Sequence, residues 1–325
     1  MAKSQTILIT GGAGFIGSHV NQMLSQEGYQ TVVLDNLSHG SRSAIQTGAF
    51  VEGDIGDRKI LEQIFQTYPI AAVMHFASFI DVGESVRNPH KYYENNVSKT
   101  LILLETMVRF GVLKFVFSST AAIFGNPLKV PLDEDHPCQP INPYGRSKWM
   151  VEQILHDFDI AHGLKFCSLR YFNAAGGDPK GIRKNYQKHS SNLIPLVLKS
   201  LKKSGSLTIN GTDYPTPDGT CVRDYIHIED LGDAHLKGLE KLLSGFPSSC
   251  YNLGNGKGYS VKEVLIATEK VTGKTVNAIE GPRRAGDPPI LVADSKKAFR
   301  EFGWQPRYPD LEDMIEHAWR AMDDA

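Results

Sequence analysis

Short apolar runs alternate with helix-like segments over the first half of the chain. Apolar runs occupy residues 6–10, 31–35, 71–77, 114–119 and 165–173, and helical spacing of apolar positions marks residues 15–28, 57–66, 92–110 and 143–162. Uninterrupted apolar strands are typical of a sheet buried on both faces, and strands separated by helices favour parallel pairing. The pattern therefore predicts an α/β fold with a doubly wound parallel sheet.

The pattern changes after about residue 174. A loop rich in Gly and Pro, AAGGDPKG, leads into a polar stretch at 180–192 that has no periodicity. Further elements are expected near 193–204, 206–210 and 310–323. We therefore expect a first domain at 1–178 and a smaller α/β C-terminal lobe at 179–325, with segments that can cross between them.

Composition and charge exclude several classes of partner. The chain has 325 residues with a formal net charge of −1, so no bulk charge attracts it to nucleic acid or anionic membranes. No apolar run approaches the ~18 residues of a membrane helix, and TILIT at the N-terminus is too short for a secretory signal. Four cysteines, Cys138, Cys167, Cys221 and Cys250, lack metal-site spacing. We expect a cytoplasmic protein without metal, membrane or nucleic-acid partners.

A glycine-rich turn follows the first expected strand. TILITGGAGFIGSH places Gly11, Gly14 and Gly17 between a strand and a helix, which is the context of a dinucleotide-binding turn. The helix N-terminus offers unpaired N–H groups to a pyrophosphate. Asp35 ends the next strand, where a carboxylate can hold an adenosine ribose, and Asn36 follows it without a nearby Arg. The sequence therefore predicts a Rossmann-type domain that binds NAD rather than NADP.

Asp54 follows a third expected strand in EGDIGD. Its carboxylate could accept a hydrogen bond from the adenine amino group of the cofactor. It could equally be the N-cap of the helix expected from residue 57. The sequence leaves both interpretations open.

Tyr144 and Lys148 stand four residues apart in NPYGRSK, so on a helix they share one face. An ammonium beside a phenol favours the phenolate and lowers the pKa of the phenol, which makes Tyr144 a candidate general base. KFVFSSTAAIFG ends a strand at Ser118, Ser119 and Thr120, and ligands bind beyond such strand ends. A hydroxyl there could relay the proton of a reacting sugar or alcohol.

Together the glycine turn, the strand-end hydroxyls and the YxxxK pair resemble the extended short-chain dehydrogenase/reductases. Further blocks resemble the UDP-glucose 4-epimerase branch of that family: LDNLSHGSR, HFASFIDVGESVRNP, YYENNV, LRYFNAAG, GTDYPTPDGTCVRDYIHIEDL and PRRAGDPP. The resemblance runs from Thr6 to about Trp319.

The resemblance implies roles for individual residues. Tyr144 would be the base at O4 of the sugar, Lys148 would tune Tyr144 and hold the nicotinamide ribose, and Thr120 would be their hydroxyl partner. The implied cofactor-binding residues are Gly11, Gly14, Phe15, Ile16, Gly17, Asp35, Asn36, Asp54, Ile55, Phe76, Ala77, Asn96, Lys148 and Phe172. The implied substrate-binding residues are Asn173, Asn192, Leu193, Thr208, Asn210, Arg223, Arg284, Asp287 and Leu291.

Two positions depart from the pattern of the family. Ile80 stands where close bacterial relatives carry Lys, which implies one cofactor contact fewer and looser retention of NAD. Leu291 lies where relatives place a side chain near the C2 substituent of the sugar. Because Leu is intermediate in size, acceptance of an N-acetylhexosamine stays open.

The implied activity is NAD-dependent interconversion of UDP-glucose and UDP-galactose, by transient oxidation at C4 to a 4-keto sugar, rotation of that sugar and return of hydride. The alternatives are an epimerase of another UDP-sugar (an N-acetylhexosamine, uronate or pentose) and a related decarboxylase. A 4,6-dehydratase needs a carboxylate pair where this chain has Ala121 and Ala122, and a NAD sensor without catalysis would not need Tyr144 and Lys148 together. The resemblance also implies a homodimer formed through two helices, one of them at 92–110.

Overall fold

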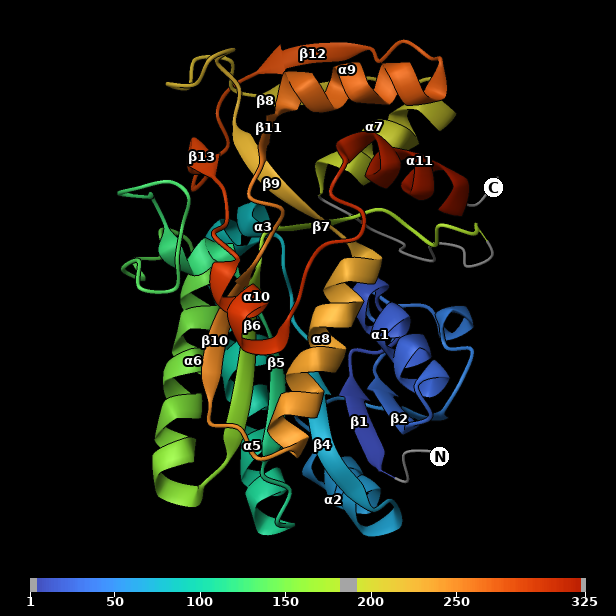
Figure 1. Cartoon of the computed structure of the whole chain (residues 1–325), viewed down its shortest axis with the longest axis vertical. Coiled ribbons are helices and arrows are strands. Elements are labelled where there is room, and N and C mark those ends of the chain that lie inside the picture. The colour runs from blue at the N-terminus through green and yellow to red at the C-terminus, as the bar shows by residue number, and fades with distance from the viewer. Residues whose placement is uncertain (1–4, 182–191, 323–325) are drawn as a thin grey trace.

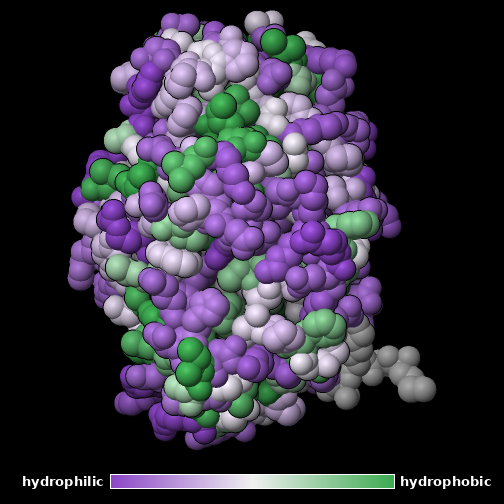
Figure 2. Space-filling model, turned by 60° about the vertical axis from the view of Figure 1, so that its left-hand side comes forward, coloured by the Kyte–Doolittle hydropathy of each residue, from purple (hydrophilic) through white to green (hydrophobic). Residues whose placement is uncertain are grey.

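The computed structural model describes residues 5–181 and 192–322, so most of the polar stretch at 180–192 lies outside the described residues. Figure 1 shows a large sheet with helices on both faces and a smaller lobe stacked at one end of it. On the face that Figure 2 shows, the surface is mostly hydrophilic, and hydrophobic residues form separate small groups. Within the described residues, no helix is both long and apolar enough to cross a membrane.

Seven strands of the described part of the chain form the large sheet in the order β10-β6-β5-β4-β1-β2-β3, and every neighbouring pair is parallel. Their bounds are β1 (Thr6–Thr10), β2 (Gln30–Asp35), β3 (Ala49–Glu52), β4 (Ile70–His75), β5 (Lys114–Thr120), β6 (Lys165–Tyr171) and β10 (Ser249–Leu253). The predicted doubly wound parallel sheet is confirmed. Its strand order reverses between β1 and β4, and ligands bind beyond the strand ends at such a switch point.

Alternate residues of each strand pack against different helices. Ile7 and Ile9 of β1 face the helices on one side, whereas Leu8 faces those on the other, and all three side chains are fully buried. The first side carries α1 (Phe15–Gln26) and α8 (Ile228–Leu243), and the second carries α2 (Arg58–Thr67), α5 (Lys99–Arg109) and α6 (Pro143–His162). Burial on both faces explains the uninterrupted apolar runs of the sequence.

The helix expected at 92–110 is not continuous. It consists of α4 (Pro89–Tyr93), a π-helical turn η2 (Glu94–Ser98) and α5. The side chain of Asn96 in this turn donates to the Phe79 carbonyl oxygen (3.0 Å) and accepts from the Phe79 amide (2.9 Å). A single wide turn therefore aims one amide at the segment after β4, which hydrophobic periodicity cannot reveal.

The strand expected at 165–173 also divides, at Phe172. β6 ends at Tyr171 in the large sheet, and β7 (Asn173–Ala175) pairs with β9 (Val222–His227) in the smaller lobe. The chain later returns to the large sheet through α8 and β10, two elements that the pattern did not predict. Residues beyond 178 thus complete the large sheet.

In the described residues, the smaller lobe contains two short sheets and three helices. One sheet has the order β11-β9-β13 with β7 added beside β9, and the other pairs β12 with β8. The bounds of its elements are α7 (Leu193–Lys202), β8 (Leu207–Asn210), β11 (Gly258–Ser260), α9 (Val261–Thr272), β12 (Ala278–Gly281), β13 (Ile290–Leu291) and α11 (Leu311–Ala321). The remaining elements are η1 (Arg42–Ala44), α3 (Val82–Arg87), η3 (Ala121–Phe124) and α10 (Lys296–Phe302). The predicted smaller α/β lobe is confirmed.

Candidate active site

The glycine turn after β1 leaves no room for side chains. Gly11 has φ +73°, and a Cβ there would lie 2.5 Å from the amide nitrogen of Ala77. A Cβ on Gly17 would lie 2.4 Å from the carbonyl oxygen of Gly11. No side chain in residues 5–181 or 192–322 caps α1 at Gly14, so the N–H groups of its first turn are available to an anion. The turn therefore brings backbone close to whatever occupies the groove above it.

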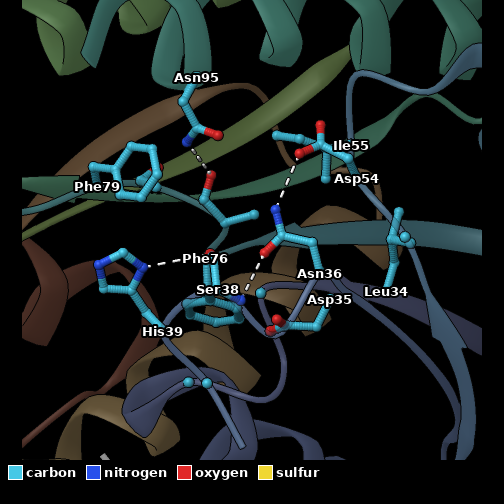
Figure 3. A pocket seen from close by; sticks show the side chains of 16 residues that line it. Leu34, Asp35, Asn36, Ser38, His39, Asp54, Ile55, Phe76, Phe79 and Asn95 are labelled. Carbon is cyan, nitrogen blue, oxygen red and sulfur yellow. Dashed lines mark hydrogen bonds between the residues drawn. The ribbon is translucent and has the colours of Figure 1, made fainter. Parts of the chain in front are cut away.

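Asp35 lies at the wall of this groove, where its carboxylate accepts from the amides of Ala13 (2.9 Å) and Leu37 (2.8 Å). Burial raises the pKa of the Asp35 carboxyl, and the two amides oppose that rise. Asn36 beside it accepts from the Ser38 amide and donates to Asp54 (3.0 Å), as Figure 3 shows. No arginine lines this described part of the groove, which suits a ribose without a 2′-phosphate.

Asp54 is not the N-cap of α2. Asp57 caps that helix, because its carboxylate accepts from the amides of Lys59 and Ile60. Asp54 instead lines the groove and accepts from Lys99 Nζ (2.9 Å) and from the Gly56 amide (2.8 Å). Desolvation opposes ionisation of Asp54, but the Lys99 ammonium and the other donors prevail and lower the pKa of the carboxyl. The helix-cap interpretation of Asp54 is therefore wrong, and the adenine interpretation stays a prediction.

The other expected cofactor residues are placed in three ways. Most line the groove: Gly11, Gly14, Phe15, Ile16, Gly17, Ile55, Phe76 and Ala77. Asn96 is buried behind the groove wall, where it holds Phe79 and donates to Ser147 Oγ (3.1 Å). Phe172 lines an adjoining cavity instead.

Tyr144 lies in the first turn of α6, which begins at Pro143 and is capped by the Asn142 side chain. The Tyr144 phenol and the Thr120 side chain both line the adjoining cavity, and the Thr120 hydroxyl favours the phenolate form of Tyr144. Because the Thr120 hydroxyl oxygen accepts from the Ala122 amide (3.1 Å), its proton is free to point at the phenol oxygen. The structure thus brings the predicted base and its hydroxyl partner together.

Lys148 follows one turn later on α6 and is almost fully buried. Its Nζ donates to Ser78 Oγ (2.7 Å) and to the Ser118 carbonyl oxygen (2.8 Å), and it lies 4.8 Å from the centre of the Phe117 ring. Burial lowers the pKa of Lys148 to about 7, and the Glu152 carboxylate opposes that fall. The ammonium therefore stands beside the groove at the end of β5.

The expected depression of the Tyr144 pKa is not present in the chain alone, and this corrects the prediction. Burial raises the pKa of Tyr144 to about 12, and the Thr120 hydroxyl only partly opposes the rise. The Lys148 ammonium is engaged by Ser78 and Ser118 instead of by the phenol. Spacing on a helix predicted a shared face, but it did not predict where the ammonium points.

The adjoining cavity gathers most of the expected substrate residues. Arg284 binds Asp287 through two hydrogen bonds (2.9 and 3.0 Å), and Arg223 lies 3.5 Å from the same carboxylate. One acidic side chain therefore holds two guanidinium groups at one wall, where they can meet an anionic ligand. The expected residues that line this cavity are Thr120, Tyr144, Phe172, Asn173, Asn192, Arg223, Arg284, Asp287 and Leu291.

Three expected substrate residues do not line the cavity. Leu193 begins α7 and packs in the core of the smaller lobe, while Thr208 and Asn210 are exposed positions of β8. Leu291, by contrast, is buried among Ala121, Ile123 and Phe124 at the cavity wall. The roles of Leu193, Thr208 and Asn210 stay predictions.

Sequence reasoning missed Ser78 and Tyr171. Tyr171 lines both groove and cavity, shares a short hydrogen bond with the Ser118 side chain and stands opposite Thr120 in the sheet. Its place at the end of a strand was the available signal, because ligands bind beyond the ends of such strands. Ser78 follows β4 closely, so its position past a strand end was a similar signal.

The groove fits the cofactor that the sequence predicts. Its floor is a turn that only glycine can form at Gly11 and Gly17, its wall carries a ribose-binding carboxylate, and it continues into the cavity through shared residues such as Ile16 and Tyr171. Among the described residues, no group of three or more His, Cys, Asp or Glu side chains could hold a metal ion.

Comparisons with known proteins agree with this geometry. The chain is 49% identical over 314 residues to the UDP-glucose 4-epimerase of Halalkalibacterium halodurans, covering 96% of this chain and 94% of the relative. Its fold matches the NAD complex of UDP-glucose 4-epimerase from Brucella ovis with a TM-score of 0.93 at 42% identity, over 97% of this chain and 98% of the other. The enzyme of Bifidobacterium longum, crystallised with NAD+ and UDP, matches with a TM-score of 0.92 at 37% identity, over 98% of each chain.

A family model agrees with these relatives and matches residues 7–254. That region runs from β1 to the end of β10, so it spans the entire large sheet. The chain therefore belongs to the NAD dependent epimerase/dehydratase family, within its UDP-glucose 4-epimerase branch.

Proposed function

We infer that this chain is an NAD-dependent UDP-glucose 4-epimerase, which interconverts UDP-glucose and UDP-galactose. The observation that carries this conclusion is one continuous space: the glycine groove opens into a cavity with the Thr120–Tyr144 pair on one wall and Arg223, Arg284 and Asp287 on another. A dinucleotide and a second diphosphate can therefore meet at one phenol.

When bound, NAD supplies a positively charged ring that accepts a hydride from C4 of the sugar and later returns it. We propose that Gly11, Gly14, Asp35 and Asn36 hold NAD, with Lys148 at its ribose and Asp54 at its adenine. The glycine turn and the α1 N-terminus suit a pyrophosphate, and Asp35 suits a ribose diol. The paired Arg223 and Arg284 suit the diphosphate of the uridine nucleotide.

Tyr144 acts as the base in this proposal. Its phenol oxygen takes the proton of the 4-hydroxyl, Thr120 keeps the hydrogen-bond chain intact, and Tyr144 returns the proton after the 4-keto sugar has turned over. Two arginines grip the nucleotide, while the walls near Tyr144 include the small apolar Ala121 and Ala122. Strong contacts away from the reacting carbon and weak contacts beside it allow the sugar to rotate while the nucleotide stays bound.

Acceptance of N-acetylhexosamines is a second candidate activity, which the intermediate size of Leu291 leaves open. Its side chain is buried at the cavity wall and is neither as small as Ala nor as large as Tyr. Purified protein should be incubated separately with UDP-galactose and UDP-GalNAc, and the products separated. We expect UDP-glucose from the first sugar. UDP-GlcNAc from the second would add the wider activity, and no product from either would contradict the proposed function.

We also propose that the chain forms a homodimer through α5 and α6. These neighbouring helices carry partly exposed apolar residues, including Leu101 on α5 and Met150 and Ile154 on α6. Sedimentation equilibrium should give twice the chain mass, and a Met150→Lys, Ile154→Lys variant should give the mass of one chain. A wild-type protein of single-chain mass would contradict this proposal.

We propose further that the cofactor domain comprises residues 1–178 together with the later segment that supplies α8 and β10, and that the protein acts in the cytoplasm. The strand order of the large sheet supports the first statement. The four cysteines, all free thiols, support the second.

A further inference from the structure

A buried ion pair lies directly behind the candidate catalytic residues. Glu152 is fully buried on α6, and the Arg170 side chain on β6 is 6% exposed. Arg170 Nη2 donates to Glu152 Oε2 (2.6 Å), and Arg170 Nε lies 3.1 Å from each Glu152 oxygen. Burial removes both charges from water, and this costs free energy that good geometry and further hydrogen bonds must offset. Such a pair therefore suggests a role beyond filling space.

The pair reaches the site through three neighbouring elements. Ser119 Oγ on β5 donates to Glu152 Oε1 (2.5 Å). Ser119 stands between Ser118, whose carbonyl oxygen accepts from Lys148, and Thr120, whose hydroxyl favours the Tyr144 phenolate. Since side chains alternate along a strand, the anchor of Ser119 on one face fixes the position of its two neighbours on the other.

The two residues of the ion pair also lie next to site residues along α6 and β6. Glu152 follows Lys148 by one helical turn, as Lys148 follows Tyr144, so the three share a face of α6. Arg170 lies opposite Ser119 in the sheet and directly precedes Tyr171, which lines the groove. Arg170 Nη1 also donates to the carbonyl oxygen of Glu134 (3.3 Å). One ion pair therefore joins α6, β5 and β6 at the positions that present the site.

We propose that Glu152 and Arg170 are positioning residues of the epimerase, which act through Ser119 and α6 to hold Lys148, Thr120 and Tyr144 in register and to keep the Lys148 ammonium charged. This inference rests on the function proposed above. Among the described residues, Glu152 and Arg170 are not part of the groove or cavity lining, so they act through the residues that are.

The charge of Lys148 provides a readout that a purely structural role would not move. Besides Glu152, Lys148 faces Ser118 and Phe117 of β5, Ser78 after β4, and His75 of β4, whose pKa burial lowers to about 3 so that it stays neutral. The phenols of Tyr144 and Tyr171 are also neutral, because burial raises the pKa of each. Glu152 is thus the anion that favours the ammonium, and its loss should let Lys148 deprotonate at lower pH.

The test combines Ser119→Ala, Glu152→Gln and the control Thr268→Val. Thr268 is a buried residue of α9 whose hydroxyl donates within its own helix, to the Val264 carbonyl oxygen (2.7 Å). We expect S119A to lower kcat for UDP-galactose by about 10- to 100-fold with little change in KM, because misplacement away from the chemistry acts on the reacting geometry. We expect E152Q to shift the alkaline limb of the kcat profile to lower pH, and T268V to change neither.

NMR of protein labelled with ¹³C-lysine supplies a second readout, with the Lys148 signal assigned by its loss in Lys148→Arg. We expect its titration midpoint to move to lower pH in E152Q. A wild-type kcat in S119A, or an unmoved midpoint in E152Q, would overturn the inference. If the wild-type protein shows no epimerisation, the proposed function fails and the midpoint alone decides the inference. If E152Q does not fold, the kcat of S119A decides it.

Discussion

At Tyr144, two opposing effects act on one phenol. Burial favours the neutral form and raises its pKa to about 12, whereas the hydroxyl of Thr120 favours the phenolate. In the chain alone the first effect prevails, so the phenol keeps its proton at neutral pH. The base we propose therefore depends on positive charge that arrives with the cofactor and on a Lys148 that stays protonated.

Replacement of Tyr144 by Phe tests this role. The variant keeps the ring and its packing but has no oxygen, so we expect kcat to fall by about 10²- to 10⁴-fold. UDP should bind with unchanged affinity in calorimetry, because the arginines of the cavity are intact. Tyr259→Phe in the smaller lobe is the matched control and should keep full turnover. Near-normal turnover of Tyr144→Phe would rule out the phenol as the base.

Arg284 is expected to bind the diphosphate of the uridine nucleotide. Asp287 holds Arg284 and Arg223 at one wall, so a diphosphate there would meet two oriented guanidinium groups. Arg284→Met should weaken UDP binding by about 10- to 100-fold, as expected for a lost charged hydrogen bond. Calorimetry measures this, with Arg58→Met as control, since Arg58 pairs with Glu105 on an exposed helix face. Equal UDP affinity in Arg284→Met and wild type would remove Arg284 from the nucleotide site.

At the scale of elements, the glycine turn after β1 positions the cofactor groove. Gly11 and Gly111 share a left-handed backbone, at φ +73° and +71°, but only Gly11 is crowded: a Cβ there would meet Ala77, whereas nothing lies within 4 Å at Gly111. Gly111→Ala should therefore cost only the backbone strain of about 1–2 kcal/mol. Gly11→Ala should cost more in denaturant unfolding and should abolish NAD binding. Similar unfolding free energies for both variants would contradict the close approach.

Hydrophobic periodicity predicted the elements that carry the site better than those that complete the sheet. α6 begins at Pro143 and ends at His162, as the spacing of apolar residues predicted, and β5 ends at its strand-end hydroxyls. α8 and β10 were not predicted, and β10 reaches the large sheet from a distant part of the sequence.

Side-chain direction was the part of the site that the sequence could not supply. The i, i+4 spacing placed Tyr144 and Lys148 on one face of α6, but the Lys148 ammonium turned to Ser78 and Ser118. The sharing of Asp287 by two arginines joins β9 to the loop before β13, so it depends on tertiary packing. The spacing of residues along the sequence predicts neither the direction of a side chain nor a contact between distant segments.

At the scale of the whole molecule, burial of histidine in the large sheet links stability to pH. His75 on β4 is fully buried between Thr10 and Thr100, and burial, aided by the charge of Lys148, lowers its pKa to about 3. An unfolded histidine titrates near ~6.5, so below that pH the unfolded chain binds a proton that the folded chain does not. Stability from this group is therefore complete above ~6.5 and declines as pH falls toward 3.

Melting curves between pH 7 and pH 5 test this linkage. Through His75 alone, the free energy of unfolding should be about 2 kcal/mol lower at pH 5 than at pH 7. His75→Gln should show a shallower fall in melting temperature over this range than wild type. His90→Gln, at an exposed position, should follow the wild-type curve. Parallel curves for His75→Gln and wild type would contradict the linkage.

One continuous groove and cavity should let the sugar lose and regain the same hydride while the nucleotide stays bound. UDP-galactose with deuterium at C4 should be incubated with the protein, and the UDP-glucose formed should be analysed by mass spectrometry and NMR. We predict that the deuterium stays at C4 in the product. Its loss to solvent during interconversion, or its persistence only in unchanged UDP-galactose, would contradict the account.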